Sequence, residues 1–97
     1  MKGKNRRVRN NNKKFMGRPV KTDILYEEFF DMIVNIREEL NFYYNDIEYW
    51  ISHGNEMSFL TDATNKISQE FKTPEELFEN GRIEGKIIKD IWNDVKI

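Results

Sequence analysis

The side chains of this chain best suited to a specific chemistry are the basic residues of its first 21 positions. That segment holds nine lysines and arginines and no acidic residue, together with one aromatic ring able to stack on a base, Phe15. The nine basic residues are Lys2, Lys4, Arg6, Arg7, Arg9, Lys13, Lys14, Arg18 and Lys21. Cations at this density suit a phosphate backbone, because each phosphate that they neutralise releases condensed counterions. Residues 1–21 are therefore predicted to bind nucleic acid.

The kinds of residue in this segment favour structured RNA slightly over duplex DNA. Arg6, Arg7 and Arg9 can form bidentate contacts to phosphate and stack on bases, whereas lysines contribute point charge alone. Phe15 can stack on an unpaired base, and arginine-rich segments are known to fold on RNA. Because nine like charges repel one another and little apolar surface accompanies them, the isolated arm is expected to be disordered.

The rest of the chain carries the opposite charge. Residues 22–97 hold the remaining seven of the sixteen basic residues and all seventeen acidic residues, which gives −10 against +9 for residues 1–21. Two oppositely charged halves imply two different partner surfaces. The alternative for residues 1–21 is a solubilising tail, or one that folds back on the acidic body and masks it. The body is either simply solvated or mimics phosphate in a basic groove of a partner protein.

Side chains for catalysis or metal binding are few. The chain has no cysteine and a single histidine, His53, which excludes thiolate sites and clusters of several histidines. His53 lacks a plausible third catalytic partner and is interpreted as a surface or turn residue. Glu75, Glu76 and Glu79 are interpreted as ordinary acids at the start of a helix. We therefore predict a protein that is not an enzyme and that takes no cofactor, metal or small-molecule substrate.

The apolar spacing predicts how the acidic body folds. Residues 22–36 are predicted to be a helix with Thr22 or Asp23 as its cap. Its apolar face would consist of Ile24, Leu25, Phe29, Met32, Ile33 and Ile36.

A hairpin is predicted over residues 38–53, with Asn45 and Asp46 as its two-residue turn. In this register the pairs Tyr44–Ile47, Phe42–Tyr49 and Leu40–Ile51 share the core face, and a slip by one residue would destroy the agreement. Three side chains on the opposite face form a candidate protein-docking surface, unless a helix covers it: Tyr43, Glu48 and Trp50.

The remaining elements complete an α+β domain. Strands are predicted over 57–61 and 66–71, and a helix is predicted to start at Pro74, capped by Thr73, and to stop at Asn80-Gly81. A last helix is predicted from about Glu84, with Ile87, Ile88, Ile91, Trp92 and Val95 on one face. The expected architecture is a disordered basic N-terminal arm (1–21), then an acidic α+β domain (22–97) with a helix, a three- to four-stranded antiparallel sheet and two C-terminal helices.

Nothing in the sequence indicates a membrane. No apolar run approaches the ~20 residues that a membrane span needs, and the N-terminus lacks the apolar stretch of a signal peptide. A cytoplasmic protein of a bacterial host cell is expected.

Two resemblances bear on function. Residues about 39–97, which contain FYYNDIEYWISH, FKTPEELFENGRIEGK and IIKDIWNDVKI, resemble a small domain common in low-GC Gram-positive bacteria and their phages, and that domain brings no assigned activity. The arm, MKGKNRRVRNNNKKFMGRP, is similar to the arginine- and asparagine-rich N-terminal arms of phage-encoded anti-CRISPR proteins that inhibit type II effector nucleases. That resemblance implies engagement of a guide-RNA–nuclease complex by Arg6, Arg7, Arg9, Lys13, Lys14 and Arg18.

The leading hypothesis is therefore an anti-CRISPR-type inhibitor whose partners are a guide RNA and a CRISPR effector nuclease. A general RNA-binding accessory protein is the first alternative. An immunity or antitoxin protein, whose acidic face neutralises a basic toxin, is the second.

Overall fold

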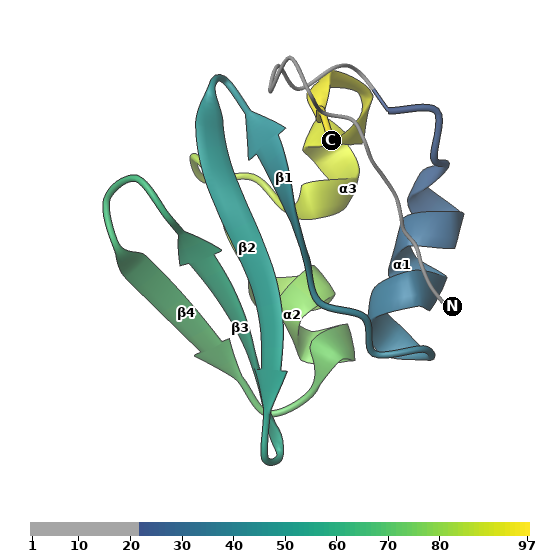
Figure 1. Cartoon of the computed structure of the whole chain (residues 1–97), viewed down its shortest axis with the longest axis vertical. Helices are drawn as coiled ribbons and strands as arrows, with labels where there is room; N and C mark the ends of the chain where they lie inside the picture. The colour runs from purple at the N-terminus through teal and green to yellow at the C-terminus, as the bar shows by residue number, and fades with distance from the viewer. Residues whose placement is uncertain (1–21) are drawn as a thin grey trace.

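A computed structural model describes residues 22–97 of the chain (Figure 1). The nucleic-acid-binding residues predicted in the arm, from Lys2 to Lys21, and its predicted disorder lie outside the described residues. The elements follow in the order α1 (Tyr26–Val34), β1 (Leu40–Tyr44), β2 (Ile47–Gly54), β3 (Met57–Asp62), β4 (Ile67–Phe71), α2 (Pro74–Asn80), α3 (Ile88–Ile91) and the 3-10 helix η1 (Trp92–Asp94). The four strands form one antiparallel sheet in sequence order, so the predicted α+β class is confirmed.

The β1–β2 hairpin has the predicted register. Phe42 pairs with Tyr49, and their rings stack with centroids 5.7 Å apart. Asn45 and Asp46 form the turn with φ values of 51° and 64°, as a two-residue hairpin loop of the I′ kind requires. The alternation of side chains along both strands therefore sends one set to the core and the other to the opposite face.

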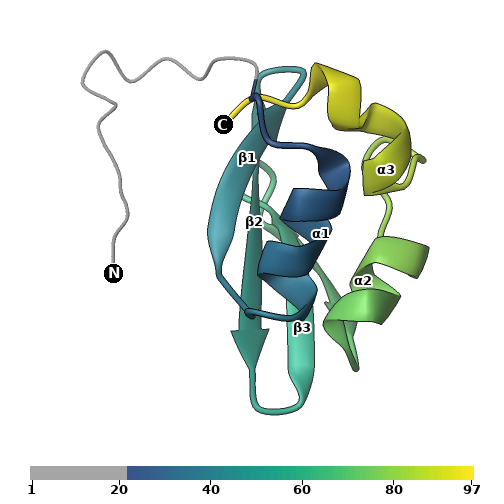
Figure 2. The same cartoon turned by 90° about the vertical axis from the view of Figure 1, so that its right-hand side faces the viewer.

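The helices α1, α2 and α3 all lie on one face of the sheet (Figure 2). The core between the two layers is centred on Phe29 of α1, which is 0% exposed and whose ring lies within 5.9 Å, centroid to centroid, of the rings of Phe42, Phe78 and Trp92. Within residues 22–97, no helix lies on the other face of the sheet.

The first helix is shorter than predicted. It begins at Tyr26 and ends at Val34, so Leu25 and Ile36 fall outside it and are 62% and 61% exposed. The predicted cap is also wrong: Leu25 is the N-cap, and its backbone N–H donates to the Glu28 carboxylate at 2.9 Å. Thr22 instead accepts a hydrogen bond from the backbone N–H of Ile24.

The apolar stripe of α1 is rotated from the predicted one. Phe29 and Ile33 are buried as predicted, while Met32 is only half-buried. Tyr26 and Phe30, which the prediction left out, pack against the core. The ring centroids of Tyr26 and Phe30 lie 6.0 and 4.9 Å from that of Phe78 in α2. Because α1 packs against α2 through these rings, its buried face is turned towards Tyr26 and Phe30.

The second helix begins as predicted. Pro74 is its first residue and Thr73 its N-cap, with the Thr73 hydroxyl accepting from the backbone N–H of Glu76 at 3.1 Å. The Glu76 carboxylate in turn accepts from the backbone N–H of Lys72.

The last helix starts later than predicted, at Ile88 instead of about Glu84. Glu84 and Gly85 have φ values of 52° and 81°, and Ile83 and Lys86 exchange two backbone hydrogen bonds around them. These residues form a two-residue hairpin turn, so no helix can pass through them. Of the predicted face, Ile88, Ile91, Trp92 and Val95 are buried and Ile87 is half-buried.

The residues after η1 return to the sheet. Tyr43 and Lys96 form an antiparallel bridge with two backbone hydrogen bonds, of 2.7 and 2.9 Å, on the outer edge of β1. The start of the described chain is held nearby, because the indole N–H of Trp92 donates to the carbonyl of Ile24 at 2.8 Å.

Candidate protein-docking face

The candidate site is the face of the sheet opposite the helices, which we call the open face. It is formed by the side chains that alternate away from the core along the four strands. Cross-strand pairing places them in rows, since Asn41 lies beside Trp50, Trp50 beside Thr61 and Thr61 beside Ser68. The residues of the open face are Asn41, Tyr43, Glu48, Trp50, Ser52, Phe59, Thr61, Ser68 and Glu70.

Glu48 is the centre of the polar contacts on this face. One oxygen of its carboxylate, Oε2, accepts from the side-chain amide of Asn41 at 2.6 Å and from the indole N–H of Trp50 at 2.8 Å. Hydrogen bonds to a charged acceptor are stronger than neutral ones, so these contacts hold both the carboxylate and the indole ring in place. The result is a fixed negative charge between two strands and beside an aromatic ring.

Tyr43 completes this cluster. Burial raises the pKa of the Tyr43 hydroxyl above its ordinary value of 10.0, and the charge of Glu48 and a side-chain hydrogen bond to Glu48 raise it further. The phenol therefore stays protonated and remains a hydrogen-bond donor beside the carboxylate.

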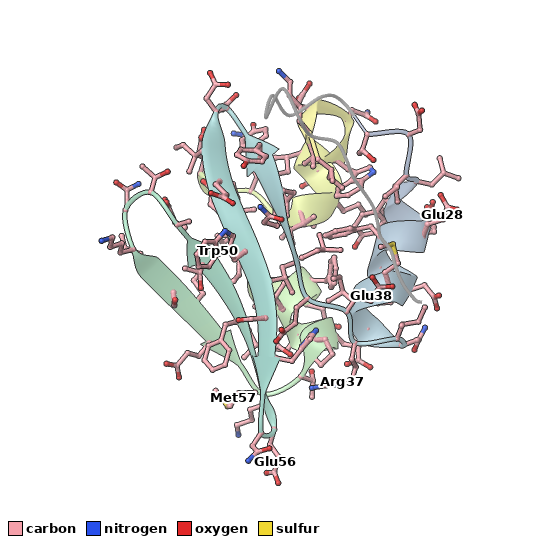
Figure 3. The ribbon with its side chains drawn as sticks, in the orientation of Figure 1. Glu28, Arg37, Glu38, Trp50, Glu56 and Met57 are labelled. Carbon is pink, nitrogen blue, oxygen red and sulfur yellow. The ribbon has the colours of Figure 1, made fainter. Side chains whose placement is uncertain are left out.

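Trp50 is the large apolar group on the open face that is most available to a partner. Its side chain is 49% exposed, although most aromatic rings of the described residues are packed in the core (Figure 3). Phe59 is half-buried next to Gly54, and the hydroxyls of Thr61 and Ser68 hydrogen-bond at 2.7 Å beside the indole. Tryptophan and tyrosine in such positions are enriched among residues that dominate protein–protein binding.

The charge of the open face is mainly negative. Glu48 and Glu70 lie on it, and Lys96 lies at its edge as the bridge partner of Tyr43. A shallow polar cavity of about 280 Å³ adjoins that edge, lined by Tyr43, Asn45, Asp46, Asp94 and Lys96. A cationic surface would match this arrangement better than a polyanion.

His53 was interpreted as a surface or turn residue at the end of a strand, and the structure places it in β2 with its side chain half-buried. It lies near the end of β2, half-buried on the core face, with Nδ1 2.9 Å from the hydroxyl of Ser58 and Nε2 3.1 Å from the carbonyl oxygen of Glu38. Since a carbonyl can only accept, Nε2 is the donor in the contact with Glu38, and Nδ1 lies within hydrogen-bond distance of the Ser58 hydroxyl. Ser58 is 0% exposed, so this pair joins the α1–β1 connection to the sheet and does not present a nucleophile.

Carboxylates of the described residues do not gather into a metal site. Over residues 22–97 no group of three or more histidine, cysteine, aspartate or glutamate side chains is placed to hold an ion. Asp62 instead accepts from the backbone N–H groups of Thr64 and Asn65 and from the Asn65 side chain in the β3–β4 turn. These hydrogen bonds lower the pKa of Asp62 below its ordinary value of 3.8, with the backbone N–H of Asn65 as the largest cause. Within the same range, no helix is long and apolar enough to cross a membrane.

The structure brings together the three residues predicted for protein docking, Tyr43, Glu48 and Trp50, and none of the helices formed by residues 22–97 covers them. Asn41 was missed as a site residue, although the predicted register already placed it opposite Trp50. Lys96 was missed because its backbone pairing with β1 follows from the path of the chain after η1, and no pattern in the sequence marks that path.

Comparison with protein-family models, with curated proteins and with solved structures finds no match to this chain.

Proposed function

We propose that this chain is a non-enzymatic inhibitor of the anti-CRISPR type, which binds a type II guide-RNA–nuclease complex and blocks DNA binding or cleavage. Residues 1–21 bind phosphates of the guide RNA or of the target DNA. The acidic body docks on a basic protein surface of the same complex. The observation that carries the proposal is the separation of charge, with +9 on residues 1–21 and −10 on residues 22–97.

A nucleoprotein complex is the partner that both halves fit. Its nucleic acid offers dense phosphate to the basic segment, and the grooves in its protein that hold nucleic acid are basic. The body alone repels nucleic acid, since it has seventeen acidic and seven basic residues. Its charge therefore favours the protein part of such a complex, and charge complementarity accelerates encounter and fixes orientation.

The open face supplies the specific contacts of the body. Trp50 offers a half-exposed indole, and Glu48 offers a carboxylate that Asn41 and Trp50 already hold in position. A pre-positioned anchor loses little conformational entropy on binding, so a small face can contribute useful affinity.

The test is cleavage of target DNA by purified type II guide-RNA–nuclease complexes, with the full chain added in excess. Cleavage is expected to fall as the chain is titrated. A variant with Arg6, Arg7 and Arg9 all changed to Gln should restore most of it. A control variant, Glu27→Gln, changes one exposed acid on α1 and should inhibit as well as the wild type. Undiminished cleavage in excess wild-type chain contradicts the proposal.

Binding to nucleic acid is measured separately, by titrating labelled guide RNA at several salt concentrations. Each phosphate contact contributes roughly 0.7–0.9 to the slope of log affinity against log salt, so three lost arginine contacts should reduce that slope by about 2–3. Equal affinity for unrelated RNAs, without any effect on the nuclease, would favour the RNA-binding accessory protein. Protein binding that survives neutralisation of residues 1–21 would favour the immunity or antitoxin protein.

A further inference from the structure

The open face has the chemistry of a receptor for cationic side chains. Asn41 and Trp50 both donate to one oxygen of Glu48, Oε2, and Tyr43 also hydrogen-bonds to this carboxylate, so its charge is held in a fixed position. The indole of Trp50 lies beside that carboxylate and is 49% exposed. An arginine or lysine can therefore pair with the carboxylate and lie over the ring, and these two contacts reinforce each other.

A second acid extends this surface across the sheet. Glu70 of β4 is exposed and pairs with Phe59 of β3, which in turn lies beside Ser52 of β2. The open face therefore carries one carboxylate on β2, Glu48, and one on β4, Glu70. The aromatic ring of Phe59 lies on β3, the strand between them. An extended segment with several separated cations can contact both.

The same chain contains such a segment. We infer that, in the free protein, residues 1–21 of the chain occupy its own open face, so that the basic segment and the acidic sheet mask each other until nucleic acid competes for the segment. This inference rests on the proposed binding of residues 1–21 to phosphate, and it adds an internal competitor for them. Charge complementarity supports it, because these residues carry nine cations and no acid.

The length of the segment and its point of attachment permit the contact. The described chain starts near the end of the sheet where β1 and β2 are joined and where the C-terminus lies (Figure 2), and it is fixed there by the hydrogen bond from Trp92 to Ile24. The described residues extend over 33 × 28 × 24 Å. Twenty-one residues can span up to about 70 Å when extended, so the segment can reach every part of the open face.

The contact is weak enough to be displaced. Exposed ion pairs stabilise little individually, but a tether raises the effective concentration of the segment to the millimolar range. A strand of RNA presents many more phosphates than the open face presents carboxylates, so RNA takes the segment and uncovers Trp50 and Glu48. Binding of nucleic acid would thus precede docking of the body on protein.

The first experiment compares the affinity of full-length variants for a fluorescein-labelled single-stranded RNA of mixed sequence at constant salt. The variant Glu48→Gln/Glu70→Gln removes the two carboxylates of the open face, and its affinity should rise roughly three- to tenfold. The control Glu27→Gln/Glu75→Gln removes the same charge from α1 and α2, on the helix layer, and should change affinity less than about twofold. Equal gains in the two variants overturn the inference.

The second experiment is carbodiimide cross-linking of the full-length wild-type chain, read by mass spectrometry. Lys13 and Lys14 should couple to Glu48 or Glu70 in excess over Glu27 and Glu75. A mixture of light and heavy isotope-labelled chains identifies the occupant. Links within one molecule join only light to light and heavy to heavy, whereas links to a second copy also join light to heavy chains and would overturn binding within one molecule. If the wild type binds no RNA, the proposed function fails, while the cross-links still decide whether the segment lies on the open face.

Discussion

Glu48 fixes the positions of its neighbours on the open face, because Asn41, Tyr43 and Trp50 all interact with its carboxylate. Two of these neighbours come from β1 and one from β2, so the carboxylate also joins the two strands on their outer side. A neutral replacement keeps the shape of this cluster and removes its charge. The cluster is therefore well suited to substitution of single residues.

Replacing Glu48 with Gln should lower the pKa of the Tyr43 hydroxyl towards its ordinary value. Burial, the largest cause of the raised pKa, remains, but the charge of Glu48 is gone. The measurement is an NMR titration of tyrosine ring carbons. Glu27→Gln is the matched control, since the charge of Glu27 acts on Tyr26 and not on Tyr43. An unchanged Tyr43 pKa in the Glu48 variant would show that the carboxylate does not act on the phenol.

Two glycines are expected to respond differently to replacement by alanine. A Cβ at Gly81 would lie 2.5 Å from the carbonyl oxygen of Leu77 and 3.1 Å from a methyl group of Leu60, so the end of α2 must shift. A Cβ at Gly85 meets nothing within 4 Å, but its φ of 81° disfavours alanine by about 1–2 kcal/mol. Urea unfolding should show a larger decrease in the free energy of unfolding for Gly81→Ala than for Gly85→Ala. A larger loss for Gly85→Ala would contradict the packing described around Gly81.

At the scale of elements, α2 depends on its first turn. It has seven residues, Pro74–Asn80, and it buries Leu77 and Phe78 in the core. A helix of this length is marginal without its cap and its packing. The hydrogen bond from the Glu76 N–H to the Thr73 hydroxyl supplies that cap.

Thr73→Ala should therefore destabilise the domain by about 0.5–2 kcal/mol, the usual cost of a lost N-cap. Chemical denaturation followed by circular dichroism measures the change. Thr64→Ala, at an exposed position of the β3–β4 turn, is the control and should change the free energy of unfolding by less than about 0.5 kcal/mol. An equal decrease in the free energy of unfolding in the two variants would mean that the Thr73 cap does not stabilise the domain.

The elements also show how far the sequence predicts the fold. The register of the β1–β2 hairpin could be predicted because core and outward-facing side chains alternate with a period of two along both strands. The turn residues Asn45 and Asp46, which tolerate positive φ, fixed where the chain reverses. The bounds of α1 and α3 did not follow. The left-handed conformation of Glu84 ends any helix that would pass through it, and glutamate gives no local sign of that conformation.

The candidate site was predictable to a similar extent. The alternation that places Phe42 and Tyr49 in the core places Tyr43, Glu48 and Trp50 on the opposite face. Whether a helix covers that face depends on the side of the sheet on which the helices pack. The apolar pattern of a helix shows which of its own faces is buried, but it does not show on which side of the sheet the helix lies. The absence of any helix of residues 22–97 from that face is therefore a result of the topology.

Burial of three tyrosine hydroxyls makes the stability of the entire domain sensitive to alkaline pH. The pKa values of Tyr26, Tyr43 and Tyr49 are all raised above 10.0, with burial as the largest cause in each. A pKa that is higher in the folded than in the unfolded state contributes stability that is complete below the unfolded value and is lost as pH rises through the folded value. The domain should therefore lose stability from about pH 10 upwards.

Urea unfolding at about pH 8 and about pH 11 tests this expectation, with a lower midpoint at the higher pH. Tyr49→Phe removes one of the three titrating hydroxyls and should reduce the difference between the two midpoints. The same difference in the variant and in the wild type would exclude a contribution from Tyr49.

The backbone pairing of Tyr43 with Lys96 has a practical consequence for anyone who handles the protein. Because residue 96 is fixed on the edge of β1, any polypeptide continued past Ile97, such as an affinity tag or a fluorescent fusion, leaves the domain alongside Tyr43. A bulky or charged fusion at the C-terminus would therefore obstruct the indole of Trp50 and the carboxylate of Glu48, which lie beside Tyr43 on the open face. Labels are better inserted in the β2–β3 turn at Asn55, at the opposite end of the sheet from the β1–β2 turn (Figure 1).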